Sequence, residues 1–414
     1  MGNGIESFSP SQRNRLARLA RRAQQAGRFS KFVPASGAAS RLFSSGLKPD
    51  PRLVALLGRD LIPLVQRPKA LIPFHRVGRE ARTAFEEHVW EGVRAGILKA
   101  HFTVPREFLA EFQRLGKACS DQIYRRYGVR PRLRFSVQDP ATETLSWEEG
   151  TGWARRPGGE LLFRPGGHGA LLKNLESTKG DIVFIKNIDN VPRSSFQAEG
   201  NRWRKVLAGR LIEVQSEAEG WLSALRKNRS SILPLEGAEK FIFKTLGLEW
   251  TGPSLSTRTT RALKILDRPW RVCGMVPNTG EPGGGPFWVE EKEGASRQIL
   301  EGAQLGKHQK KFIRQSTHFN PVDMVVGLKD GQRRPYDLAR FADPTHVLIS
   351  TKIFEGRAIR TLEHPGLWNG GMAHWNTLFV EIPATVFHPV KTISDLLRPG
   401  HNRILPSPLE SKLK

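Results

Sequence analysis

The sequence predicts an α/β fold built on a partly parallel sheet. Short apolar segments that end in glycine-rich or polar turns are separated by stretches with helical spacing. Such alternation is typical of sheets that bind their ligands at the carboxyl ends of the strands. The strands that we expect are residues 32–34, 133–138, 182–185, 270–275, 324–326 and 347–350, and residues 153–163 are expected to form a hairpin.

Three segments depart from this alternation. Residues 1–30 hold a basic amphipathic helix at 9–25, in which Leu16, Leu19 and Ala23 are spaced for one face. An arginine-rich amino terminus is also typical of organellar transit peptides, but a strand follows directly here, which favours a docked helix. Residues 194–250 are predicted to be a helical insertion in a domain that spans 31–398, and residues 399–414 to be a surface tail.

The net charge, the number of cysteines and the length of the apolar runs limit the classes of function that this chain can have. The 414 residues carry a formal net charge of +25, and residues 1–134 hold 26 Lys or Arg against 10 Asp or Glu. Such a field attracts nucleic acid, anionic lipid or phosphate-bearing small molecules, although a solvated basic face would look the same. Two cysteines exclude a disulfide framework and a cysteine-based zinc site. With no apolar run of about 18 residues, we expect a cytoplasmic protein without a membrane span.

Two stretches in the first third could bind phosphate. In VPASGAASR, residues 33–41, a buried strand runs into a turn of small residues and then a predicted helix. The backbone N–H groups of such a turn and a helix amino terminus can hold a phosphate, and Arg41 could reach the same oxygens. Lys69 follows a proline in RPKALIPFH, where a plain surface loop is the alternative. The small residues of the turn are Ala35, Ser36, Gly37 and Ala38.

Two central stretches carry a histidine and a carboxylate. Gly167 and Gly169 flank His168 in FRPGGHGALLKNL, which suits a backbone that packs closely on a base or sugar. A structural histidine in a turn is the alternative for His168. Asp189 follows an apolar strand in DIVFIKNIDNV, and a carboxylate at a strand end suits Mg²⁺, which needs few protein ligands. A turn or N-cap role for Asp189 stays open.

The last third adds polar side chains near strand ends. Gly284, Glu301 and Asn320 suit hydrogen bonding to sugar hydroxyls, and Lys391 in FHPVKTISDLL could donate to a phosphate. Ser394 and Asp395 are expected to cap the helix that follows. No HExxH zinc motif, Gly-x-Ser-x-Gly elbow, RNP-like aromatic set or zinc finger occurs in the sequence.

Taken in order, these stretches resemble the signature of the UDP-sugar pyrophosphorylases. PGGHGALLKNL is similar to the Pro-Gly-His-Gly stretch of that family, KNIDNV to its Asn-x-Asp-Asn strand end, and QILEGAQL to its Leu-Glu-Ile-Ala-Gln segment. FHPVKTISDLL is similar to Phe-Leu-Pro-Val-Lys-Thr-x-Ser-Asp-Leu-Leu and is the most specific match. Over residues 8–400 the chain resembles still more closely a bacterial family known only as a domain of unknown function.

The resemblance implies a GT-A-like fold with a mostly parallel sheet flanked by helices. It also implies a Mg²⁺-dependent reaction in which an NTP, with UTP as the expected one, and a sugar 1-phosphate give an NDP-sugar and pyrophosphate. By this resemblance the 35–38 turn, Arg41, Lys69 and Lys391 would hold the phosphates, and Asp189 would hold the metal. Gly167, His168 and Gly169 would border the base, and Gly284, Glu301 and Asn320 would bind the sugar.

The chain departs from the family at two places. The first loop is poorer in glycine, and Lys69 lies 28 residues beyond Arg41. Where the family reads Phe-Asn-Thr-Asn-Asn, residues 319–323 read Phe-Asn-Pro-Val-Asp, which makes Asp323 either a second metal ligand or a turn residue. These departures keep open a catalytically silent protein that binds a nucleotide or nucleotide-sugar. The net charge alone keeps open a nucleic-acid-binding protein.

Overall fold

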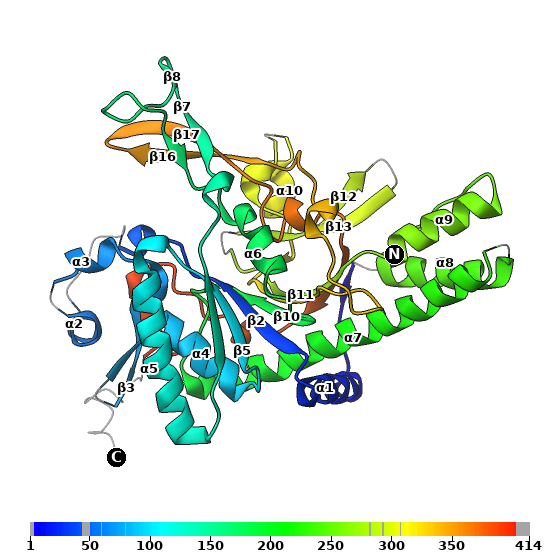
Figure 1. Cartoon of the computed structure of the whole chain (residues 1–414), viewed down its shortest axis with the longest axis horizontal. Coiled ribbons are helices and arrows are strands. Elements are labelled where there is room, and N and C mark those ends of the chain that lie inside the picture. The colour runs from blue at the N-terminus through cyan, green and yellow to red at the C-terminus, as the bar shows by residue number, and fades with distance from the viewer. Residues whose placement is uncertain are drawn as a thin grey trace. The chain divides into compact units, whose positions relative to one another are not determined.

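The computed structural model describes residues 4–43, 50–58, 60–78, 80–229, 231–280, 283–291, 294–306 and 308–402 (Figure 1). The chain forms two compact units. Unit 1 comprises Met1–Ser30, Gln138–Ile185 and Arg204–Pro383, and unit 2 comprises Lys31–Val137, Lys186–Trp203 and Ala384–Lys414. Each unit is therefore assembled from three separate segments of sequence.

Unit 2 is built on parallel strands covered by helices. Strand β2 (Phe29–Pro34), most of which belongs to this unit, pairs in parallel with β5 (Lys99–Thr103), which pairs in parallel with β6 (Arg132–Ser136). Helices α4 (Ala84–Arg94) and α5 (Leu109–Tyr127) pack on each other and on these strands (Figure 1). Phe85 of α4 and Phe112 of α5 meet Phe102 of β5 in a fully buried core. Removal of these aromatic rings from water stabilises the unit.

A second core in unit 2 joins its first and last segments. The hairpin of β3 (Pro73–Val77) and β4 (Glu80–Thr83), the short helices α2 (Pro51–Leu57) and α3 (Ile62–Val65), and the carboxyl-terminal 3₁₀ helix η11 (Ile393–Leu397) surround it. Phe74, Val191 and Val390 are fully buried in this core. The residues after 384 are thereby fixed beside those near 190.

Unit 1 contains a mixed sheet in the order β1-β18-β11-β15-β10. Strands β1 (Ile5–Glu6), β18 (Asn376–Glu381) and β11 (Trp270–Pro277) are parallel, whereas β15 (Asp323–Gly327) is antiparallel to β11. All residues of β15 and of β10 (Ile182–Lys186) are buried, which explains their unbroken apolar runs. The helices of unit 1 are α1 (Pro10–Gln25), α6 (Leu172–Glu176), α8 (Ile232–Leu246), α9 (Leu255–Leu266), α10 (Lys310–Arg314) and most of α7 (Gln197–Lys227). The start of α7, up to Trp203, belongs to unit 2.

Smaller sheets complete unit 1. One contains β16 (Leu348–Phe354), β17 (Arg357–Glu363), β7 (Thr144–Glu148), β8 (Gly152–Trp153) and β9 (Phe163–Arg164). A second is the hairpin of β12 (Gly285–Glu291) and β13 (Gly294–Leu300). The two-residue strand β14 (His318–Phe319) pairs with the end of β11. None of the helices in the described part of the chain is long and apolar enough to cross a bilayer.

Most of the predicted elements are confirmed, with three corrections. The basic helix begins after an N-cap at Ser9, and Leu207, Leu211 and Val214 of α7 are buried as their spacing predicts. The strand predicted at 347–350 does not join the main sheet, because residues 348–350 begin β16 of a side sheet. The helix expected after the small-residue turn is only the 3₁₀ helix η1 (Ser40–Phe43), so it supplies no helix dipole of useful length.

The third correction concerns the predicted surface tail. Gly400 and His401 are buried, because His401 Nδ1 lies 2.9 Å from His75 Nε2 and the two rings stack. This histidine pair holds the start of the segment inside unit 2. Residues 403–414 of the predicted tail lie outside the described residues.

Candidate functional site

Three of the predicted phosphate and metal residues meet in unit 2. Lys391 Nζ lies 2.9 Å from Asp189 Oδ2, and Lys69 Nζ lies 3.5 Å from the same oxygen. We call these residues the Lys–Asp–Lys cluster. They come from positions far apart in the sequence, so the approach depends on the tertiary fold. Lys69 and Asp189 are largely buried, whereas the Lys391 side chain is 44% exposed and is the cluster's contact with solvent.

Backbone hydrogen bonds join the small-residue turn to Lys69. The Lys69 amide donates to Gly37 O at 2.9 Å, and the Ala39 amide donates to Arg67 O at 3.0 Å. Pro68 is extended and ends the strand-like bridge with Ala38, after which Lys69 begins the 3₁₀ helix η2 (Lys69–Leu71). Lys69 Nζ also donates to Val390 O at 3.3 Å. Lys69, which lies 28 positions beyond Arg41, is therefore held beside the small-residue turn.

The turn leaves backbone donors available. Within the described part of the chain, the amides of Ser36, Gly37 and Ala38 donate no hydrogen bond, and Gly37 and Ala38 are exposed. Ala35 is held by its own amide, which donates to Thr103 O at 2.9 Å. Amides in such a turn suit an anionic oxygen. The side chain of Arg41, the other predicted phosphate ligand here, lies outside what the structure describes.

Residues 189–190 and 388–395 are fixed together by a local network. Val390 N donates to Asp189 O at 2.9 Å, and His388 N donates to Asn190 Oδ1 at 3.0 Å. Asp395 Oδ2 accepts from the amides of Lys391 and Thr392, which closes the capping box of η11. The predicted capping role is confirmed for Asp395, but the N-cap is Thr392, and Ser394 lies inside the helix. The Lys391 backbone is thus held in place while its side chain reaches Asp189.

A buried ion group that sequence reasoning missed lies at the base of this network. Glu91 of α4 binds Lys186 Nζ at 2.5 Å and Lys31 Nζ at 2.7 Å, and all three side chains are at most 3% exposed. Lys186 stands three residues before Asp189 and Lys31 lies in β2, so Glu91 ties a helix to two strands. A lysine inside an apolar strand is the sequence signal for such a group, but its acidic partner cannot be read from spacing.

His88 extends this support to the Asp189 loop. Its Nε2 lies 3.1 Å from Ile188 O, and because a carbonyl only accepts, Nε2 carries the proton. Complete burial lowers the pKa of His88 well below its ordinary value, with a further lowering from Lys31. The ring is therefore neutral and donates to the residue that precedes Asp189.

One carboxylate oxygen of the cluster is suited to bind a divalent cation. Asp189 Oδ1 is buried and has no hydrogen-bond partner among the described residues, whereas Oδ2 binds the lysines. No group of three His, Cys, Asp or Glu side chains in the described ranges is arranged to hold a metal. A cation here would take one carboxylate from the protein and its other ligands from phosphate and water, which is the usual pattern for Mg²⁺.

The predicted base and sugar residues gather in unit 1. His168 Nε2 lies 3.9 Å from Glu301 Oε1, and the Asn320 amide donates to Gly284 O at 2.8 Å. A Cβ built on Gly284 would lie 3.3 Å from Glu301 Cγ, so these pairs are in contact. We call His168, Glu301, Gly284 and Asn320 the His168 cluster. The buried Asn320 Nδ2 has no hydrogen-bond partner among the described residues, whereas Asn320 Oδ1 accepts from Val322 N.

Trp368 belongs to the same place and was not predicted. Its ring stacks on His168 at 4.2 Å between centroids, and its Nε1 lies 3.4 Å from Glu301 Oε1. The Leu367 amide donates to His168 Nδ1 at 3.0 Å, so the neutral ring presents its Nε2 proton toward Glu301. Burial lowers the pKa of His168, although Glu301 and Glu363 oppose that shift.

The glycines around His168 serve the chain itself. A Cβ on Gly169 would stand 2.2 Å from Pro365 O, and one on Gly167 would stand 2.5 Å from Glu363 Oε2. Gly167 also has φ +73°, which favours glycine. The close backbone approach that the sequence predicted is therefore to residues 363–365 of the same unit.

Asp323 forms an ion pair with an arginine and does not lie in a turn. It begins β15, and its carboxylate lies 3.3 Å from Arg204 Nε with both side chains buried. The sequence left open whether Asp323 is a second metal ligand or a turn residue, and its carboxylate is instead engaged in this ion pair. Val322 before it has φ +55°, where the chain bends out of β14 into β15.

Comparison with known proteins places the chain in a family. A family model described as "Domain of unknown function (DUF4301)" matches residues 1–51 and 50–402. The chain belongs to the DUF4301 family. No curated protein matches it. The membership confirms the resemblance to a family of unknown function.

Solved structures that are similar to this DUF4301 chain include two pyrophosphorylases. The uridine diphosphate N-acetylglucosamine pyrophosphorylase from Trypanosoma brucei, in complex with an inhibitor, is similar with a TM-score of 0.54 and 13% identity, over 96% of this chain and 71% of that one. A mutant UDP-glucose pyrophosphorylase from Leishmania major in complex with UDP-Glc gives a TM-score of 0.49 and 14% identity, over 91% and 65%. The mixed α/β fold predicted for the chain is thus confirmed, with a pyrophosphorylase among its structural relatives.

Proposed function

We propose that this DUF4301 protein is a nucleotidyltransferase that joins UTP and a sugar 1-phosphate to give a UDP-sugar and pyrophosphate. The observation that carries the proposal is the Lys–Asp–Lys cluster, in which two lysines and one carboxylate from three distant motifs meet beside a turn with available amides. The similarity of fold to a UDP-N-acetylglucosamine pyrophosphorylase supports it.

In this reaction a phosphate oxygen of the sugar 1-phosphate attacks the α-phosphorus of UTP. The new P–O bond forms as the bond to the leaving pyrophosphate breaks, and no covalent enzyme intermediate is needed. Negative charge accumulates on the leaving group, so catalysis consists of positioning and charge neutralisation. The amides of Ser36, Gly37 and Ala38 would hold phosphate oxygens, and Lys69 and Lys391 would neutralise their charge.

Mg²⁺ is the expected cofactor and would supply charge neutralisation at the phosphates when bound. Asp189 would hold it through Oδ1, the oxygen that accepts no hydrogen bond among the described residues. Both lysines contact Asp189 Oδ2. Phosphate oxygens would compete with Asp189 for these ammonium groups, so the lysines already lie where a phosphate would bind.

Within unit 1, the His168 cluster would bind a sugar and a base. The Glu301 carboxylate suits sugar hydroxyls, as does Asn320 Nδ2, which has no hydrogen-bond partner among the described residues, and Gly284 packs closely against Glu301. Gly167, His168 and Gly169 would border the base, for which the neutral His168 ring and its Trp368 stack offer a flat, partly buried surface. A side-chain NH₂ and a carboxylate together provide both a donor and an acceptor for hydroxyl groups.

A nucleotide-binding protein without turnover is the second candidate. The observation that favours it is that Asp189 Oδ2 is already engaged by two lysines, while Asp323 is engaged by Arg204 and adds no second metal ligand. Such a protein would bind UTP or a UDP-sugar with the same residues but would release no pyrophosphate.

Paired turnover and binding measurements on variants test the proposal. With UTP, Mg²⁺ and a panel of sugar 1-phosphates, we expect Asp189→Asn and Lys391→Ala to lower the rate of pyrophosphate release by at least about 100-fold. Lys117→Ala is the matched control, because Lys117 is an exposed lysine of α5 in the same unit. Wild-type rates in both variants would overturn the site assignment. Calorimetric UTP binding without release in the wild type would favour the silent binder.

A further inference from the structure

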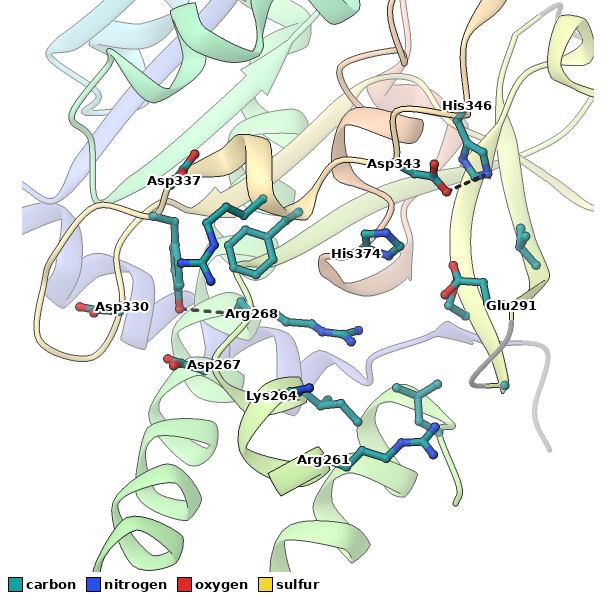
Figure 2. A pocket seen from close by; sticks show the side chains of 18 of the residues that line it. Arg261, Lys264, Asp267, Arg268, Glu291, Asp330, Asp337, Asp343, His346 and His374 are labelled. Carbon is teal, nitrogen blue, oxygen red and sulfur yellow. Dashed lines mark hydrogen bonds and ion pairs between the residues drawn. The ribbon is translucent and has the colours of Figure 1, made fainter. Parts of the chain in front are cut away.

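A large cavity in unit 1 lies apart from the residues of the Lys–Asp–Lys cluster and of the His168 cluster. Its volume is about 1170 Å³, and no member of either cluster lines it. Its walls come from α9 and the residues that follow it, from the β12–β13 hairpin, and from the segment 330–346 (Figure 2). Cavities of this size accommodate a metabolite-sized ligand.

One wall is basic. Arg261, Lys264 and Arg268 follow one another at i, i+3 and i+7, so α9 and its end present all three to the cavity. In Figure 2 the guanidinium end of Arg268 extends into the middle of the cavity. Arg340 adds a fourth cation from the segment 330–346. Lys264 and Arg340 are exposed and form no ion pair or hydrogen bond through their side chains in the described part of the chain.

Two of the six carboxylates that line the cavity are paired with an arginine. Asp330 lies 2.7 Å from Arg334 Nη2, and Asp267 lies 3.1 Å from Arg226 Nη2. Asp343 accepts from the amide and hydroxyl of Thr345. The charge that remains for a ligand is therefore mainly positive near α9.

The other walls offer groups suited to hydroxyls and a ring. Tyr336 and Phe341 pack edge to face at 5.8 Å between centroids, which gives a rigid apolar corner. Asp337 and Glu290 are exposed carboxylates, which accept hydrogen bonds from hydroxyl groups. His346 Nδ1 is buried with no hydrogen-bond partner among the described residues.

We propose that this cavity is a second binding site, which takes a phosphorylated polyhydroxy compound such as a sugar phosphate. The phosphate lies against Lys264, Arg268 and Arg340, and the hydroxyl groups face Asp337 and Glu290. A phosphate dianion among several cations is held by charge-assisted hydrogen bonds. The inference rests on the cavity alone and stands whether or not the Lys–Asp–Lys cluster catalyses the proposed reaction.

Calorimetric titration with three probes tests this site. Glucose 1-phosphate carries both kinds of group, inorganic phosphate carries only the anion, and glucose carries only the hydroxyls. We expect glucose 1-phosphate to bind more tightly than inorganic phosphate, and glucose to give no measurable heat. The titrations use the intact Lys391→Ala protein, in which we expect phosphate to bind more weakly at the Lys–Asp–Lys cluster, so that binding at the cavity is measured separately.

The variant pair Lys264→Glu and Arg340→Glu reverses two exposed charges in the cavity. We expect the double variant to bind glucose 1-phosphate at least tenfold more weakly. Lys240→Glu is the control, because Lys240 is exposed on α8, carries the same charge and does not line the cavity. Unchanged unfolding temperatures would show that both proteins are folded. Equal affinity in the double variant and the control, or no binding of either phosphate probe, would overturn the proposal.

Discussion

Replacement of Glu91 should be among the most destabilising single changes in unit 2. The Glu91 carboxylate is 1% exposed and binds Lys186 at 2.5 Å and Lys31 at 2.7 Å, and both lysines are buried. Glu91→Ala removes the carboxylate that both ammonium groups share. Removing one partner of a buried ion pair costs about 3–5 kcal/mol. For a unit of this size, such a loss corresponds to a fall in Tm of about 6–20 °C.

Two comparisons isolate the charge from the shape. Glu91→Gln keeps the side-chain volume and one acceptor oxygen, so we expect a smaller loss of about 1.5–3 kcal/mol. Glu107→Ala removes an exposed carboxylate of the same unit and should change stability by about 0.5 kcal/mol or less. Urea unfolding followed by circular dichroism measures all three. If Glu91→Ala were as stable as Glu107→Ala, the buried ion group would not hold the unit together as argued.

Three further outcomes follow from the described contacts. His88→Ala should cost about 1–3 kcal/mol by leaving Ile188 O without its donor, and a His88→Gln variant that gave no recovery would count against this reading. Gly169→Ala should destabilise by more than about 2 kcal/mol because its Cβ would overlap Pro365 O, whereas Gly37→Ala, with open space around it, should be neutral in urea unfolding. Burial, with Arg134 adding to it, lowers the pKa of His101 to about 4. In the unfolded chain this histidine takes up a proton below about pH 6.5, whereas in the folded protein it stays neutral down to about pH 4. Protonation therefore favours the unfolded state, and we expect the free energy of unfolding to fall by about 2 kcal/mol between pH 8 and pH 5. His101→Gln should remove that part of the pH dependence; an unchanged slope would contradict the assignment.

The strands were predictable because their physical signature is local. The apolar runs at 182–185 and 324–326 are buried on both faces of a sheet, which forces a continuous hydrophobic sequence. The segment 347–350 has the same local signature, but its residues 348–350 belong to β16, where alternate residues are exposed. Which sheet a strand joins depends on distant partners, and a single short run does not specify them.

The candidate site was predictable only in part. The order of motifs indicated Lys69, Asp189 and Lys391, and the fold brings both lysine Nζ atoms to within 3.5 Å of Asp189 Oδ2. Nothing in the local sequence of Glu91 indicates that it binds Lys186, because the pair is 95 residues apart and forms only in the folded core. The glycines beside His168 showed that something packs closely there, but the contacting segment lies almost 200 residues further on.

The basic residues of the cavity wall can be recognised in the sequence, but the cavity itself cannot. The spacing of Arg261, Lys264 and Arg268 was visible in the sequence, yet a basic helix face usually lies in water. Only the hairpin and the 330–346 segment opposite it turn that face into the wall of a cavity. The same residues would be unremarkable on a free helix.

The reverse reaction tests the central claim most directly. The wild-type protein is mixed with pyrophosphate, Mg²⁺ and, in turn, UDP-glucose, UDP-galactose and UDP-N-acetylglucosamine, and the UTP formed is measured. We predict UTP formation from at least one of them, lost in Asp189→Asn and retained in Lys117→Ala. A folded protein that forms no UTP from any of the three, or forms it equally well without Asp189, would contradict the account.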